Sequence, residues 1–136
     1  MDYKRAISDN LSTDLYRLVE PKLAEAPRSV PELERWVRSY AAHIEAAAAS
    51  NNFPDMDLEL GRACGAACLA LLEAAGPRPD DDALRVLNAA CRYFAASNDD
   101  EDDLESLVGF DDDAMVINAC ARVLGHEDVV IPLTPR

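Results

Sequence analysis

The sequence has few basic and few aromatic residues for its length. Lysine and arginine together number 13 against 26 aspartates and glutamates, which gives a formal net charge of −13 over 136 residues. A nucleic-acid backbone or an anionic membrane surface is bound through clusters of Lys and Arg, which this chain lacks. We therefore expect no nucleic-acid partner, whereas a basic protein surface would complement the charge.

Long hydrophobic runs and a recognisable leader are also missing. An acidic residue or an arginine interrupts every apolar stretch before it reaches the roughly 20 residues needed to cross a bilayer. The chain does not begin with the charged and then apolar pattern of a secretory signal. All four cysteines fall inside apolar helical patterns, so we expect reduced thiols and a cytoplasmic location. These cysteines are Cys64, Cys68, Cys91 and Cys120.

The common catalytic motifs are absent as well. There is no G-x-S-x-G sequence, phosphate-binding loop or dinucleotide fingerprint. A zinc site is disfavoured because no C-x-x-C pair occurs and His43 and His126 are the only histidines. We therefore interpret the cysteines as core residues and favour a protein that is not an enzyme.

What the sequence does contain is a series of helical patterns. Apolar residues recur at helical spacing in five segments, separated by short breaks that contain proline, glycine or aspartate. We predict an all-α fold in a single domain over residues 1–136, an irregular bundle of about five helices with a short helical turn before the last. The helical segments are Leu11–Leu23 after the possible caps Ser8 and Asp9, Val30 to the break at Asn51, Met56–Ala75, a segment from Asp80–Asp82 to about Ala95, and Asp112–Leu124.

Two further features bear on packing. Gly61 and Gly65 lie inside the third predicted helix, where glycine costs about 1 kcal/mol relative to alanine. We expect a neighbouring helix to approach closely there, within the chain or across a homodimer. Trp36 is assigned to the core, and the apolar tail Val129–Leu133 is expected to lie extended in a groove between helices, because no second strand is predicted to pair with it.

The region between Arg92 and Arg122 contains no basic residue. Nine acidic side chains lie between Asp99 and Asp113, interspersed with apolar residues that can dock on a core. Asp102 can cap a short helix over 103–108, and Gly109 can close it in the left-handed conformation. We therefore predict that this acidic segment folds.

The same segment resembles the YkvA-like family of bacterial domains of unknown function. The family's signature is a helix end, two spaced aspartates, a glycine and an Asp-Asp pair, and it can be laid on about residues 84–124 without a gap. Ser97 and Asp102 stand where the family usually has prolines. The resemblance implies a helical fold and candidate residues but no reaction. The matching residues are Tyr93, Asp99, Asp103, Gly109, Asp112 and Asp113.

Two roles are open for Asp99, Asp103, Asp112 and Asp113. If the chain brings these carboxylates together, their repulsion would be relieved by a hard divalent cation, Mg²⁺ or Ca²⁺. Alternatively, Asp112 caps the last helix, Asp113 interacts with its N-terminal amides, and the other two satisfy backbone donors. We favour the structural role because aspartate is common at helix N-termini.

Three functions fit these observations. The first is a noncatalytic protein-binding or scaffolding module in the cytoplasm, which engages a basic partner. The second is a cation-binding domain or metal-dependent enzyme that uses the four aspartates. The third is an inhibitor of the immunity or antitoxin kind, which neutralises a basic partner.

Overall fold

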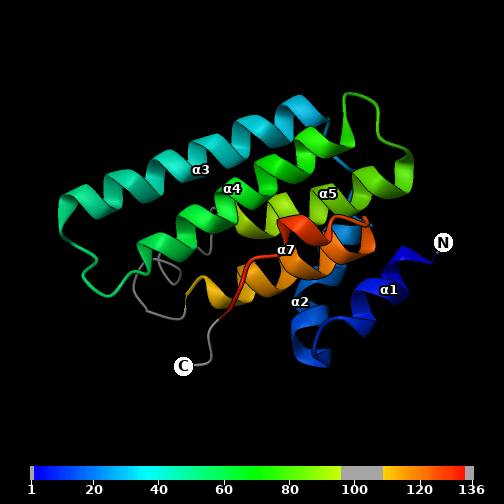
Figure 1. Cartoon of the computed structure of the whole chain (residues 1–136), viewed down its shortest axis with the longest axis horizontal. Coiled ribbons are helices and arrows are strands. Elements are labelled where there is room, and N and C mark those ends of the chain that lie inside the picture. The colour runs from blue at the N-terminus through cyan, green and yellow to red at the C-terminus, as the bar shows by residue number, and fades with distance from the viewer. Residues whose placement is uncertain (1, 96–108, 134–136) are drawn as a thin grey trace.

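The computed structural model describes residues 2–95 and 109–133, and all the regular elements in these ranges are helical (Figure 1). The predicted all-α class is confirmed there, although six α-helices are present where about five were predicted. No helix in the described ranges is long and apolar enough to cross a membrane. The elements are α1 (Tyr3–Asp9), α2 (Thr13–Ala24), α3 (Val30–Ser50), α4 (Leu58–Ala75), α5 (Asp81–Phe94), α7 (Asp111–Val123) and the 3-10 turn η2 (Glu127–Val129).

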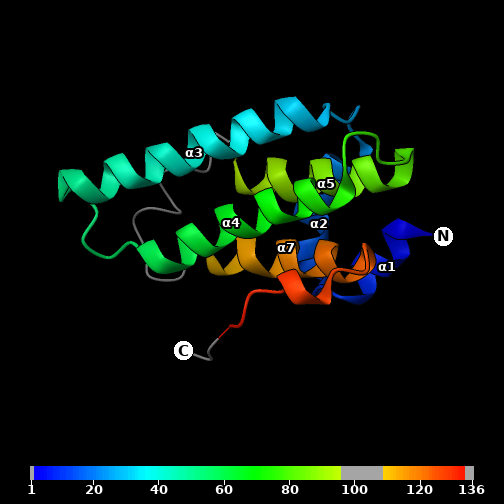
Figure 2. The ribbon, with the colours of Figure 1, turned by 45° about the horizontal axis from the view of Figure 1, so that its top comes forward.

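Helix α5 forms the centre of the bundle. It packs against α2, α3, α4 and α7, and every residue from Val86 to Cys91 is buried. A helix that is buried on all sides must be surrounded by other helices, and Figures 1 and 2 show α5 enclosed in this way. Helices α3 and α4 form one side of the bundle, while α1 and α2 lie beside α7 on the other.

The prediction of one helix near the N-terminus is wrong, because the chain forms two. The hydroxyl of Ser12 accepts a hydrogen bond from the amide of Leu15 at 3.2 Å, so a new helix begins after Ser12 rather than after Ser8 or Asp9. Leu15, Val19 and Leu23 are buried as the spacing predicts. Leu18 lies in the same predicted segment at helical spacing, but this residue is 59% exposed.

The remaining breaks follow the local signals. Ser29 and Glu32 form a capping box at the start of α3, and Asn51 ends that helix in the left-handed conformation with a φ of 61°. Asp80 caps α5 by accepting a hydrogen bond from the amide of Ala83 at 2.8 Å. The boundaries predicted for these helices are therefore close to the observed ones.

The two glycines of α4 are in close contact with the rest of the same chain. A Cβ atom at Gly61 would lie 2.8 Å from Cε2 of Phe110, whereas a Cβ atom at Gly65 would lie 3.7 Å from the Cβ of Ala41 and from the ring of Phe94. The close contacts at these glycines lie inside the chain, but the nearest atoms belong to side chains and not, as predicted, to the backbone of a neighbouring helix. This face of α4 is therefore used within the fold.

The C-terminal tail packs only partly as predicted, because Val129 belongs to the 3-10 turn η2 and Leu133 is 38% exposed. Turn η2 contacts both α4 and α7, and the side chain of Ile131 is buried. The side chain of Asn118, on α7, donates to the carbonyl oxygen of Ile131 at 2.9 Å, and its Oδ1 accepts from the amide of Ile131 at 2.7 Å. The side-chain amide of Asn118 therefore makes the two hydrogen bonds to the backbone of Ile131 that a neighbouring strand would make.

Candidate functional site

The four predicted site aspartates are only partly covered by the structure. Asp99 and Asp103, with the predicted short helix over 103–108, lie outside the described residues. Asp112 and Asp113 both lie in the first turn of α7, but Asp112 is exposed while Asp113 is only 3% exposed. Consecutive residues on a helix point about 100° apart, which accounts for this difference.

The prediction that Asp112 caps the last helix is wrong. Helix α7 begins at Asp111, and its N-cap is Phe110, which makes no side-chain cap hydrogen bond. The ring of Phe110 is fully buried against Gly61, at the position where the helix begins. In the ranges 2–95 and 109–133, no three side chains of His, Cys, Asp or Glu are placed to hold a metal ion together.

The cysteines are core residues, as predicted. All four are buried free thiols. A hydrogen bond with Cys91 and burial raise the pKa of Cys68, and burial raises the pKa of Cys120 to about 12. Because the thiolate is the nucleophile and the metal ligand, thiols that keep their protons at neutral pH are poorly suited to either task.

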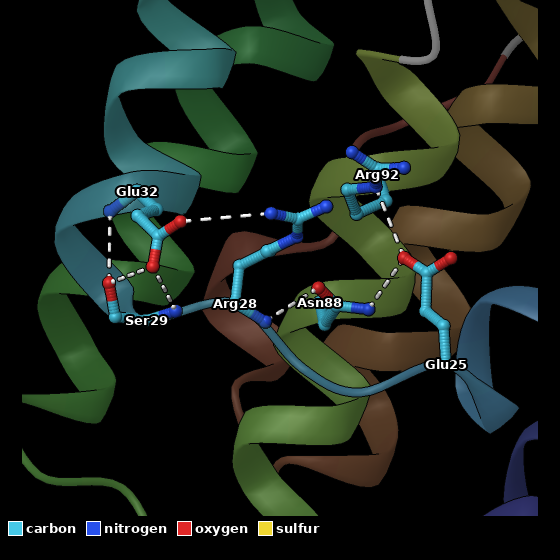
Figure 3. A network of polar contacts seen from close by, with 6 residues as sticks. All are labelled: Glu25, Arg28, Ser29, Glu32, Asn88 and Arg92. Atoms are coloured by element: carbon cyan, nitrogen blue, oxygen red, sulfur yellow. Dashed lines mark hydrogen bonds and ion pairs between the residues drawn. The ribbon is translucent and has the colours of Figure 1, made fainter.

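A polar network joins the link between α2 and α3 to the central helix (Figure 3). The buried side chain of Asn88 accepts a hydrogen bond from the amide of Arg28 at 3.1 Å and donates to Oε1 of Glu25 at 3.1 Å. Arg92 donates to the same Glu25 oxygen at 3.1 Å. The guanidinium carbon of Arg92 lies 3.8 Å from the ring centroid of Trp36.

Trp36 therefore differs from its predicted role as a core residue. It is half-buried and contacts two arginines, since the guanidinium carbon of Arg28 also lies over its ring, 5.1 Å from the centroid. This network is not predicted from the sequence, because its members lie about 60 residues apart in the chain. The one available signal was the spacing of Asn88 and Arg92, which places both on the same face of α5.

The described structure has a hollow at the end of the bundle where α5 begins and α7 ends. Its volume is about 530 Å³. Its lining comes from the first turns of α5, from α1 and from the end of α7, and consists of Asp80, Asp81, Asp82, Ala83, Val86, Tyr3, Val123 and Leu124. We call this feature the acidic hollow. Concave sites with apolar walls and a few charged groups are typical of ligand binding.

From the sequence, Asp80, Asp81 and Asp82 are predicted only to mark the start of a helix. That prediction is correct for Asp80, which caps α5. Their position beside apolar residues of α1 and α7 could not be predicted from local spacing, because it depends on how three separate elements pack.

Comparisons of the chain with protein-family models, with curated proteins and with solved structures found no match.

Proposed function

We propose that the chain is a noncatalytic protein-binding module that engages a basic partner surface. The observation that carries this proposal is the pairing of its arginines with acids of the same chain. Five arginines, Arg28, Arg38, Arg62, Arg85 and Arg92, each lie within 4 Å of a carboxylate oxygen. Since acids outnumber bases 26 to 13, many carboxylates have no basic residue left to neutralise them.

Much of this excess charge faces solvent. Exposed acids occur at both ends of the bundle, for example Asp55 and Glu59 at the start of α4 and Asp80–Asp82 at the start of α5. Complementary charge raises association rates and rejects partners of the wrong sign, so such a surface selects basic proteins. An inhibitor of the immunity or antitoxin kind is one form that this function can take.

We also propose that the chain is related to the YkvA-like family, a relationship that implies no catalysed reaction. The alternative, a divalent-cation site, would have to draw on Asp99 and Asp103 together with Asp112 and Asp113. Within the described residues, the differing exposure of Asp112 and Asp113 does not favour that alternative over protein binding.

The proposal is tested by capturing partners with the full chain and then measuring the binding of the purified partner. An extract of the source organism is passed over the immobilised protein, and any captured protein is purified and titrated at 50 and 200 mM NaCl. We expect a partner with net positive charge whose dissociation constant rises with salt by about tenfold or more. A neutral or acidic partner, salt-independent binding or no partner would contradict the proposal.

A further inference from the structure

We infer that the acidic hollow is the place where a basic partner docks, and that it receives a lysine or arginine side chain together with an adjacent apolar residue. This inference rests on the proposed function, because it names the chemistry of the partner segment. The inference is based on the lining of the hollow, which combines apolar side chains with carboxylates that outnumber the neighbouring positive charge of Arg85.

The charge of the hollow favours a cation despite its position at a helix N-terminus. That end of a helix carries the equivalent of about half a positive charge, which repels cations. Arg85 adds one more positive charge, since its Nε lies 3.4 Å from Oδ2 of Asp81. The C-terminus of α7 lies at the same hollow and carries about half a negative charge, which offsets the dipole of α5, so the three carboxylates of Asp80–Asp82 exceed the positive charge of Arg85.

The carboxylates also retain acceptor capacity. Oδ1 of Asp80 accepts one hydrogen bond from the amide of Ala83. The side chain of Asp81 is 78% exposed although it contacts Arg85. Because an ionised carboxylate offers about four acceptor sites, an incoming ammonium or guanidinium group can be bound without breaking these bonds.

The apolar residues of the lining account for the apolar part of the ligand. Val86, Val123 and Leu124 come from two different helices, and Tyr3 comes from a third. Lysine and arginine carry three or four methylene groups that pack on apolar surface while the charged end stays at the rim. A volume of about 530 Å³ lies within the usual range for ligand pockets, roughly 300 to 1,000 Å³, and so leaves room for an apolar neighbour.

The test uses the full chain and fluorescently labelled octapeptides whose binding is measured by anisotropy at 50 mM NaCl. One peptide alternates Lys and Leu, a second alternates Lys and Ser, and spermidine serves as a competitor. The Asp81→Asn/Asp82→Asn variant removes rim charge but keeps the Asp80 cap. The matched control, Asp55→Asn/Glu59→Gln, removes the same charge at the opposite end of the bundle. Circular dichroism confirms that each variant is folded.

We expect the Lys-Leu peptide to bind at least fivefold more tightly than the Lys-Ser peptide. The Asp81→Asn/Asp82→Asn variant is expected to weaken binding about tenfold and the control variant less than twofold. Val123→Thr, which keeps the shape and the charge of the site, is expected to weaken only the Lys-Leu peptide, by about threefold.

Equal losses in the two charge variants would overturn the assignment to the hollow while leaving a general basic-partner function in place. Equal binding of the two peptides would overturn the role of the apolar lining residues. Displacement of the peptide by spermidine at a concentration below the peptide's own dissociation constant would assign the hollow to a small polyamine instead. If neither basic peptide binds but a basic partner is still captured from extract and binds in a salt-dependent way, the assignment of docking to the hollow is overturned and the proposed function stands.

Discussion

At the scale of single residues, alanine substitutions at Gly61 and Gly65 allow two effects on stability to be measured separately: the destabilisation by overpacking and the stabilisation by higher helix propensity. Both lie inside α4, where alanine is favoured over glycine by about 0.5 to 1 kcal/mol. A Cβ at Gly65 would make ordinary contacts at 3.7 Å, but a Cβ at Gly61 would lie 2.8 Å from the fully buried ring of Phe110. Overpacking of this kind costs about 1 to 3 kcal/mol.

We therefore expect opposite signs for two identical substitutions. Gly65→Ala should raise the free energy of unfolding by about 0.5 to 1 kcal/mol, and Gly61→Ala should lower it by about 1 kcal/mol. Urea denaturation followed by circular dichroism measures both. A Gly61→Ala variant as stable as Gly65→Ala would show that the Phe110 ring can move aside at no cost.

Cys120 gives a prediction for alkaline pH. In the unfolded chain its thiol ionises near 9, whereas in the folded protein burial raises its pKa to about 12. Between these values the unfolded state loses a proton that the folded state keeps, so stability falls as pH rises through this window. Each such thiol contributes a slope of about 1.4 kcal/mol per pH unit.

Substitution of Cys120 by alanine should remove that contribution. We expect the free energy of unfolding of Cys120→Ala to fall less steeply between pH 8.5 and 10.5 than that of the unchanged protein, whatever its value at pH 7. Because burial is the larger cause of the raised pKa of Cys120, with the neighbouring Cys91 the smaller one, the difference in slope reports mainly on the burial of this thiol. Equal slopes would mean that the Cys120 thiol ionises in the fold as it does in water.

At the scale of elements, the network around Trp36 fastens the α2–α3 link to α5. Arg92→Met keeps the aliphatic stem but removes the ion pair with Glu25 and the cation–π contact with Trp36. We expect a loss of about 1 to 2 kcal/mol of stability and a shift in the fluorescence emission of Trp36, the single tryptophan.

Arg38→Met is the matched control for that prediction. Arg38 also pairs with a glutamate, Glu34, at 3.1 Å, but the pair is exposed and four residues apart on one helix. Such pairs contribute about 0.3 to 0.5 kcal/mol, so this variant should be nearly as stable as the unchanged protein. Similar losses for the two variants would show that Arg92 acts only as another surface ion pair.

The elements themselves were largely predictable from sequence, because their boundaries are set by nearby residues. The capping box of Ser29 and the aspartate cap at Asp80 both act within three positions of the residue they cap. The prediction failed at the N-terminus, where α1 was not predicted and α2 begins after Ser12 rather than after Ser8 or Asp9. The start of α7 was predicted to within one residue, but its N-cap is Phe110 and not Asp112, and the contact of Phe110 with Gly61 is distant in the chain.

The candidate site was less predictable than the elements for the same reason. The acidic hollow requires three elements to meet, and the network around Trp36 joins residues about 60 positions apart. Local spacing identifies neither. It did identify the cysteines and the close contacts at the α4 glycines, since small and apolar residues at helical spacing imply burial wherever the partner comes from.

At the scale of the whole molecule, the net charge of −13 predicts self-repulsion that salt relieves. The melting temperature should rise with NaCl as the screening length falls from about 30 Å at 0.01 M to about 10 Å at 0.1 M. A monovalent salt provides the reference for this effect because it screens without requiring a defined site.

The same measurement separates protein binding from the divalent-cation alternative. If the carboxylates do not form a cation site, MgCl₂ and CaCl₂ should raise the melting temperature no more than NaCl at the same ionic strength. A specific site would add a saturable stabilisation of about 2.7 kcal/mol at a hundredfold excess over its dissociation constant. An additional shift of that kind with MgCl₂ or CaCl₂, if it is lost in Asp112→Asn, would replace the protein-binding proposal with a cation-binding one. The variant is decisive because non-specific screening depends on total charge and is barely altered by the removal of one carboxylate.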